Sequence, residues 1–179
     1  MKTPIYLRLK HLLSASLLAL TFAGVPAHAA DDYPAQAIPA MQRCPVCGMY
    51  PAQFPAWATQ VVFKDRSMAA PESPAELFRF LQDVRKYDPR HTAADIARIY
   101  VTDYVQHTWI DAKQAFYVEG SKQRGPMAAD LPAFATKAAA EIFIKESGGR
   151  ITTFDVLVPA GANMHSGHGG HDMHGNMRH

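Results

Sequence analysis

Both cysteines of this 179-residue chain lie in one short segment, CPVCGM, which runs from Cys44 to Met49. Two residues separate the thiols, so a turn can direct both sulfurs at one ion. Gly48 allows the tight backbone that brings Met49 to the same side. Thiolate and thioether are soft ligands, and soft sulfur selects Cu(I). The segment therefore predicts a soft-metal site made by Cys44, Cys47 and Met49.

Two other uses of a C-x-x-C segment have to be weighed. Structural zinc requires four Cys or His donors, and only His91 and His107 lie in the region expected to fold. A thioredoxin-like redox pair lies at the start of a helix whose dipole lowers the thiol pKa. Pro51 and Pro55 make such a helix improbable here. Zinc is disfavoured, and a thiol-disulfide oxidoreductase stays open as the alternative function.

The N-terminus sets the expected compartment. Residues 1–29 contain a positive start, an apolar run from Leu12 to Val25, and an A-x-A sequence that ends at Ala29. This is the pattern of a cleaved secretory signal peptide, and the apolar run is shorter than the roughly 20 residues of a transmembrane helix. The sequence therefore predicts export to the periplasm.

Charge and length limit the remaining classes of protein. Removal of the signal lowers Lys plus Arg from 18 to 15, against 16 Asp plus Glu, so the balance becomes about −1. No basic stripe is present, which argues against a nucleic-acid partner. A mature chain of about 150 residues corresponds to one ordinary domain.

The elements that must position the thiols follow an extended leader over residues 30–43. We expect one domain over residues 44–158, with a strand over 57–64 and a helix that Ser73 caps and that runs to about Lys86. Further strands are expected over 96–104, 108–112, 115–119 and 151–158, with a loop over 120–129. A second helix is expected from Asp130 to Gly148, with Phe134, Ala138 and Ile142 buried. This order predicts an α+β fold, a small mixed-sheet domain.

Other candidate residues are weaker. Met127 follows Gly125 and Pro126 in a polar loop, and by itself it is typical of a methionine that fills a gap in the core. Asp103 and His107 lie near a strand end without a nucleophile, which indicates a structural or surface role. None of the common catalytic motifs is present, so the sequence does not predict an enzyme.

The segment from 159 to 179 changes composition and is predicted to be a disordered His/Met-rich tail. Imidazole suits Cu(II), and thioether suits Cu(I), so the tail could hold copper in either oxidation state. The candidate ligands in the tail are His165, His168, His171, Met173 and His174.

At this point the chain resembles the NosL family, copper-binding accessory proteins of nitrous oxide reductase. The resemblance rests on CPVCGM with the YPAQFPAW that follows, then VTDY, WIDAKQAFYV, the Pro126-Met127 pair and the closing SGGRITTF. These segments appear in the family's order and cover most of residues 41–158.

The resemblance implies a periplasmic Cu(I) chaperone that serves maturation of nitrous oxide reductase in denitrification, with a copper transporter as a further possible partner. It also implies two similar ββαβ-like halves, and it makes Met127 a metal ligand. Family members are usually lipoproteins, but no cysteine precedes Cys44, so this chain is expected not to be membrane-anchored. General copper capture or resistance is a second alternative, because the tail is an addition to the family pattern.

Overall fold

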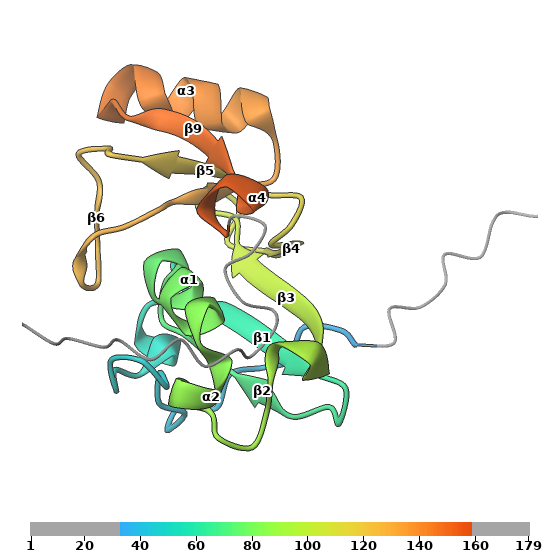
Figure 1. Cartoon of the computed structure of the whole chain (residues 1–179). Helices are drawn as coiled ribbons and strands as arrows, with labels where there is room; N and C mark the ends of the chain where they lie inside the picture. Colours follow the sequence, from blue (N-terminus) through green and yellow to red (C-terminus); the bar gives the residue numbers. More distant parts are fainter. Residues whose placement is uncertain (1–32, 159–179) are drawn as a thin grey trace, which may run out of the picture. The chain divides into compact units, whose positions relative to one another are not determined.

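The computed structural model describes residues 33–158, and the predicted signal peptide and His/Met-rich tail lie outside them. Two antiparallel sheets and a short hairpin form the framework (Figure 1). The strands are β1 Thr59–Phe63, β2 Met68–Ala69, β3 Ile96–Thr102, β4 Trp109–Asp111, β5 Phe116–Glu119, β6 Arg124–Gly125, β7 Ala128–Ala129, β8 Ala133–Phe134 and β9 Arg150–Thr153. The helices are α1 Pro74–Gln82, α2 Val84–Tyr87, α3 Lys137–Ser147 and α4 Phe154–Leu157, with 3₁₀ turns at Pro51–Gln53 and Ala93–Asp95.

The two sheets repeat one arrangement of strands. In the first, β1 pairs with β2 on one side and with β3 on the other, and α1 lies between β2 and β3 in the chain. In the second, β5 pairs with β8 and β9, and α3 lies between those two. Each half is therefore a ββαβ unit, and the predicted α+β fold is confirmed. All strand pairs inside the described sheets are antiparallel. The parallel pairing that a mixed sheet would contain is found only in an isolated bridge between Asp103 and Ala133 among the described residues.

Asp103 connects the two halves at this bridge. Its buried carboxylate accepts the backbone N–H groups of Val105 and Gln106 in its own turn. The other oxygen accepts the N–H of Ala135, beyond β8, at 2.7 Å. Buried carboxylates need such partners, so the structural role expected for Asp103 follows from these bonds.

One hydrophobic core extends through both halves. Its members include Val61 and Phe63 of β1, Leu77 of α1, and Tyr117 of β5, all fully buried. The hydroxyl of Tyr117 donates to the carbonyl of Ala112 at 2.7 Å, which satisfies its polar atom inside the core. A smaller cluster of Val118, Phe134 and Ala140 fills the space under α3. Because the core is shared, the first half and its cysteine segment are held by packing from the second.

The first predicted helix starts where expected and ends earlier. Ser73 caps α1, and its side chain accepts the N–H of Glu76. The helix ends at Gln82, not near Lys86, because Asp83 takes up a non-helical conformation and caps the separate short helix α2. A side chain that competes for backbone N–H groups favours such a break.

The second predicted helix was placed too early. Thr136, not Asp130, caps α3, while Phe134 belongs to β8, and Ile142 is exposed. Gly148 ends α3 with φ of +69°, as expected of a glycine at this place. The expected loop over 120–129 contains the β6–β7 hairpin, and the last strand gives way to α4 after Thr153.

Within residues 33–158, none of the helices has both the length and the apolar character needed to cross a membrane.

The buried His91 side chain joins two turns of the first half through two carboxylates. Its Nδ1 lies 2.8 Å from Asp88, its Nε2 lies 3.1 Å from Asp65, and its ring stacks on Phe63. Burial lowers the pKa of the imidazole, but the hydrogen bonds to Asp88 and Asp65 outweigh it, so the pKa is raised. Asp65 is more than half exposed, so solvent screens its share.

We expect His91→Asn to destabilise the protein more at about pH 5.5 than at about pH 8.5. A folded-state pKa above the unfolded value means that the charged ring stabilises fully below about pH 6.5, and that this contribution is lost as the pH rises through the folded pKa. The expected loss at the lower pH is roughly 1–2 kcal/mol. Urea unfolding at both pH values measures it, with His107→Asn at an exposed turn as the control. An equal loss at both pH values would contradict a charged His91.

Candidate metal centre

The CPVCGM segment folds into a closed turn built on backbone hydrogen bonds. The N–H of Cys44 donates to the carbonyl of Met49 at 2.8 Å, and the N–H of Gly48 donates back to the carbonyl of Cys44 at 2.9 Å. Gly48 has φ of +76°, and among the described residues no atom lies within 4 Å of a Cβ added there. Glycine is therefore needed for its left-handed backbone and not for space.

Arg43 braces this turn from outside. Its guanidinium donates to the carbonyl of Gly48 at 2.9 Å and lies 4.5 Å from the centre of the Tyr50 ring. After Tyr50 the chain enters the 3₁₀ turn Pro51–Gln53 and not an α-helix. The cysteines thus lack the helix N-terminus that lowers the thiol pKa in redox pairs.

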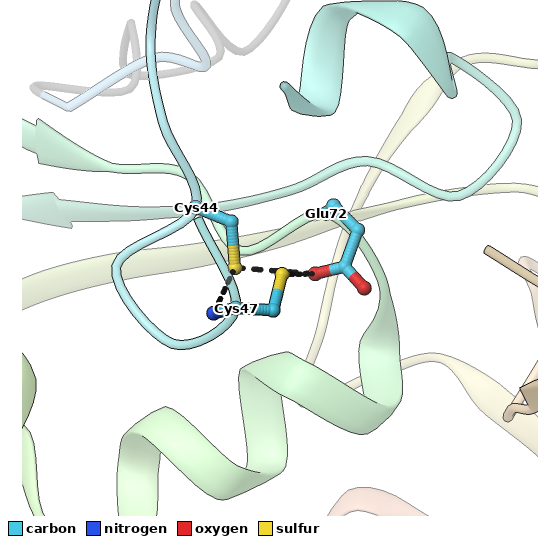
Figure 2. A group of neighbouring side chains, drawn as sticks. All are labelled: Cys44, Cys47 and Glu72. Carbon is cyan, nitrogen blue, oxygen red and sulfur yellow. Dashed lines mark hydrogen bonds between the residues drawn. The ribbon is translucent and has the colours of Figure 1, made fainter. Parts of the chain in front are cut away.

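Both thiols point to one oxygen of Glu72 (Figure 2). Cys44 donates to Glu72 Oε2 at 3.2 Å and Cys47 donates to the same atom at 3.0 Å, so the three ligand atoms lie within 4.8 Å of one another. Cys44 and Glu72 are buried and Cys47 is partly exposed. Both cysteines are free thiols.

Glu72 is held in place by the segment that joins β2 to α1. The neighbouring carbonyl of Pro71 accepts both the N–H and the hydroxyl of Thr59, which lies on β1. On the other side Ser73 starts α1. The second carboxylate oxygen, Oε1, is buried and has no hydrogen-bond partner in the described part of the chain. The carboxylate is therefore fixed on the sulfurs by the backbone on both sides of it.

The surroundings favour the protonated thiols. Burial raises the pKa of Cys44, hydrogen bonds with Cys47 and with the backbone of Glu72 partly offset this, and the hydrogen bond to the Glu72 carboxylate raises the pKa again. Burial also raises the pKa of Cys47, and the neighbouring Cys44 thiol and Glu72 raise it further. The N–H of Cys47 donates to the sulfur of Cys44 at 3.3 Å, which favours a thiolate at Cys44. The pair is thus neutral in the metal-free protein at physiological pH.

Two more buried carboxyl groups lie at the start of α1. Burial raises the pKa of Glu76, and Glu72 and Asp130 raise it further against the opposing effect of Arg79. Burial likewise raises the pKa of Asp130, which accepts the N–H of Ala75 at 3.1 Å. Both carboxyl groups are therefore shifted towards their protonated forms, and neither makes a hydrogen bond to a thiol among the described residues.

The structure brings together only part of the predicted ligand set. Cys44, Cys47 and the backbone of Met49 share one turn, and the Met49 side chain is partly exposed. Met127 lies on the turn of the β6–β7 hairpin and is 49% exposed, so the gap-filling role first considered for it is wrong. Met68 lies on β2. The tail candidates His165, His168, His171, Met173 and His174 lie outside the described residues.

Sequence reasoning missed Glu72. The stretch from Ser73 to Glu76 was correctly interpreted as a helix start, and Glu72 before it was given no role. The available signal was an acidic residue next to a helix cap and between two prolines, which indicates a rigid segment. No local pattern shows that such a segment faces cysteines 25 or more positions away.

We expect Glu72→Gln to lower the pKa of both thiols. The substitution removes an acceptor that stabilises the S–H form, and it supplies an amide N–H that can donate to a thiolate. Both pKa values should stay above the ordinary thiol value, because burial is the largest cause of the shift. The ultraviolet absorbance of the thiolates, followed against pH in the reduced protein, measures the change.

Glu76→Gln is the matched control for that titration, since Glu76 is equally buried but makes no hydrogen bond to a thiol. It should leave the thiol titration close to that of the parent protein. Unchanged thiol pKa values in Glu72→Gln would show that the hydrogen bonds to this carboxylate do not govern the pair.

Comparison with known proteins shows which family the chain belongs to. A family model described as NosL matches residues 34–160. The copper-binding lipoprotein NosL of Stutzerimonas stutzeri is 32% identical, over 74% of this chain and 76% of that protein. The crystal structure of the copper chaperone NosL from Shewanella denitrificans matches with a TM-score of 0.59 and 30% identity, over 69% of this chain and 94% of that one. This chain belongs to the NosL family.

Proposed function

We propose that this protein is a non-catalytic periplasmic copper chaperone that carries Cu(I) at Cys44 and Cys47. The observation that carries the proposal is the convergence of two free thiols on one point beside a buried carboxylate. The names of its relatives, a copper-binding lipoprotein and a copper chaperone, support copper as the cargo.

The chemistry of the donors favours the lower oxidation state of copper. Thiolate sulfur is soft and matches Cu(I), while Glu72 is a harder oxygen donor that suits other metals. We assign Glu72 to holding the metal-free thiols and not to holding the cargo. Met49 and Met127 are the thioethers proposed to complete the site, because Met49 closes the cysteine turn and Met127 is the methionine that the family resemblance implies as a ligand.

Loading and release follow from the protonation of the pair. Only a thiolate binds metal, so each Cu–S bond displaces a proton from a group whose pKa is raised. This lowers the affinity below that of a preformed thiolate pair. A carrier benefits from that reduction, because its cargo must leave for a receiving enzyme.

The receiving partner that we propose is nitrous oxide reductase, whose copper sites the cargo would complete during maturation. A copper transporter is a second partner consistent with this role. The predicted signal peptide lies outside the described residues, and the lipoprotein relative supports an exported protein. For this chain we propose a periplasmic location.

A thiol-disulfide oxidoreductase is the less favoured reading of the same cysteines. Such an enzyme attacks with a thiolate whose pKa is lowered. Here both thiol pKa values are raised, and the residues after Cys47 form a 3₁₀ turn. An environment that keeps both thiols protonated until a metal displaces the protons suits a metal carrier better than a thiol nucleophile. General copper capture would share the core site and differ in having no dedicated partner.

We expect the reduced protein, truncated after Pro159, to bind one Cu(I), with an affinity that rises with pH. Each displaced proton should strengthen apparent binding about tenfold per pH unit from roughly pH 6 to 8, so two displaced protons give about a hundredfold. Competition with a chromophoric Cu(I) chelator at several pH values measures the slope. A pH-independent affinity, or full binding by the Cys44→Ser, Cys47→Ser double variant, would contradict the thiolate site.

The tail is proposed as a separate and weaker copper site. An unperturbed imidazole has a pKa near 6.5, so we expect protons to compete with Cu(II) at its histidines as the pH falls towards about 5, whereas methionines do not titrate and should keep their affinity for Cu(I). Truncation after Pro159 should remove acid-labile copper equivalents and leave the core Cu(I) unchanged. Metal analysis of the full and truncated chains after dialysis at about pH 7 and about pH 5 tests this. Loss of the core site on truncation would show that the tail supplies one of its ligands.

A further inference from the structure

The β6–β7 hairpin carries Met127 but has little structure of its own to hold that residue in place. Each strand has two residues, paired as Arg124 with Ala129 and Gly125 with Ala128, and the hairpin forms a sheet separate from the other two. A lone two-stranded hairpin is at best marginally stable. The position of the turn at Pro126 and Met127 must therefore depend on contacts at the ends of the hairpin.

Asp130, directly after β7, provides such a contact. Its buried carboxylate accepts the N–H of Ala75, 55 positions earlier in the chain, at 3.1 Å. This N–H is one of the groups that a helix start leaves without an internal partner. Pro74 has no N–H, and Ser73 accepts that of Glu76, so Asp130 completes the cap of α1. Figure 1 shows the hairpin extending from the β5–β9 sheet towards this helix.

The cap lies next to the thiol site in the sequence and in the fold. Glu72, which accepts hydrogen bonds from both thiols, is two residues before the first residue of α1. The end of the hairpin is therefore tied to the same short segment that carries the thiol acceptor. A shift of Asp130 relative to Ala75 would move Met127 relative to Cys44 and Cys47.

Gly125 makes the contact close. A Cβ added to Gly125 would lie 2.3 Å from Oδ2 of Asp130 and 2.6 Å from its Cβ. The second of these atoms is not the end of a flexible side chain, so any residue larger than glycine must displace the hairpin or the carboxylate. Opposite Gly125, Ala128 has φ of +85°, a strained conformation for alanine that persists only where its surroundings fix it.

We propose that Asp130 and Gly125 form a joint that sets the position of the Pro126-Met127 turn relative to the thiol pair, so that the contribution of Met127 to metal binding depends on this joint. The inference rests on the proposed function, in which Met127 is a ligand. Both residues are positioning residues, because neither is assigned a bond to the metal. The joint requires an acceptor of the right shape at position 130 and does not require a charge.

The test is Cu(I) affinity of the reduced full chain, measured by competition with a chromophoric chelator. The variants are Met127→Ala, Gly125→Ala and Asp130→Ala, together with each joint variant combined with Met127→Ala. Loss of a group that positions a ligand lowers metal affinity about 10- to 100-fold. We expect this loss in Gly125→Ala and Asp130→Ala, a loss at least as large in Met127→Ala, and no further loss when a joint variant is added to Met127→Ala.

Three further variants separate positioning from general destabilisation. Asp130→Asn keeps the acceptor and the shape, so it should retain the affinity of the parent. Ala128→Gly relieves the strain within the hairpin and leaves the joint unchanged, so it too should bind normally. Asp103→Ala removes another buried carboxylate that ties segments together, and it should lower the melting temperature without lowering Cu(I) affinity.

The outcomes distinguish the joint from the proposed function. If Met127→Ala loses affinity but Gly125→Ala and Asp130→Ala bind normally, or if the losses multiply in the double variants, the joint is wrong and Met127 remains a ligand. If Met127→Ala binds Cu(I) with the affinity of the parent, Met127 is not a ligand, and the proposal that Asp130 and Gly125 position it is wrong as well. The thiolate site is judged separately, by the Cys44→Ser, Cys47→Ser double variant, which also measures what the tail holds.

Discussion

The hydrogen bonds from both thiols to a single oxygen of Glu72 are the interaction on which the site depends. They are possible only because the closed turn at Cys44–Met49 and the segment before α1 face each other, each held by backbone hydrogen bonds. Removing Glu72 from water is costly, and its second oxygen has no partner within residues 33–158. The buried carboxylate therefore lowers the stability of the fold, and such a locally unfavourable feature is typical of a functional site.

The same contact explains why the pair can be both protected and reversible. Burial and the carboxylate keep the thiols protonated, and a protonated thiol is slow to react with oxidants or other thiols. A metal must displace these protons, so its binding is weaker than the sulfur donors alone would allow. The raised thiol pKa would thus account both for the low reactivity of the metal-free pair and for the weaker, reversible binding of a metal.

The sequence predicted what local rules determine. The turn at Cys44–Met49 was predicted because C-x-x-C followed by glycine fixes its own backbone, and the start of α1 was predicted because Ser73, Pro74 and Glu76 form a local cap. Asp130 has equally good capping chemistry but was assigned to the wrong helix, because its partner Ala75 is distant in the chain. Glu72 was missed for the same reason. The two-residue strands of the β6–β7 hairpin are too short for any periodicity to reveal them.

The most direct test of the central claim is X-ray absorption at the copper edge of the reduced protein, truncated after Pro159 and loaded with one equivalent of copper. The account predicts Cu(I) with sulfur neighbours alone, and loss of this signal in the Cys44→Ser, Cys47→Ser double variant. A first shell of nitrogen or oxygen neighbours, or an unchanged spectrum in the double variant, would contradict the assignment of the two thiols as the copper site.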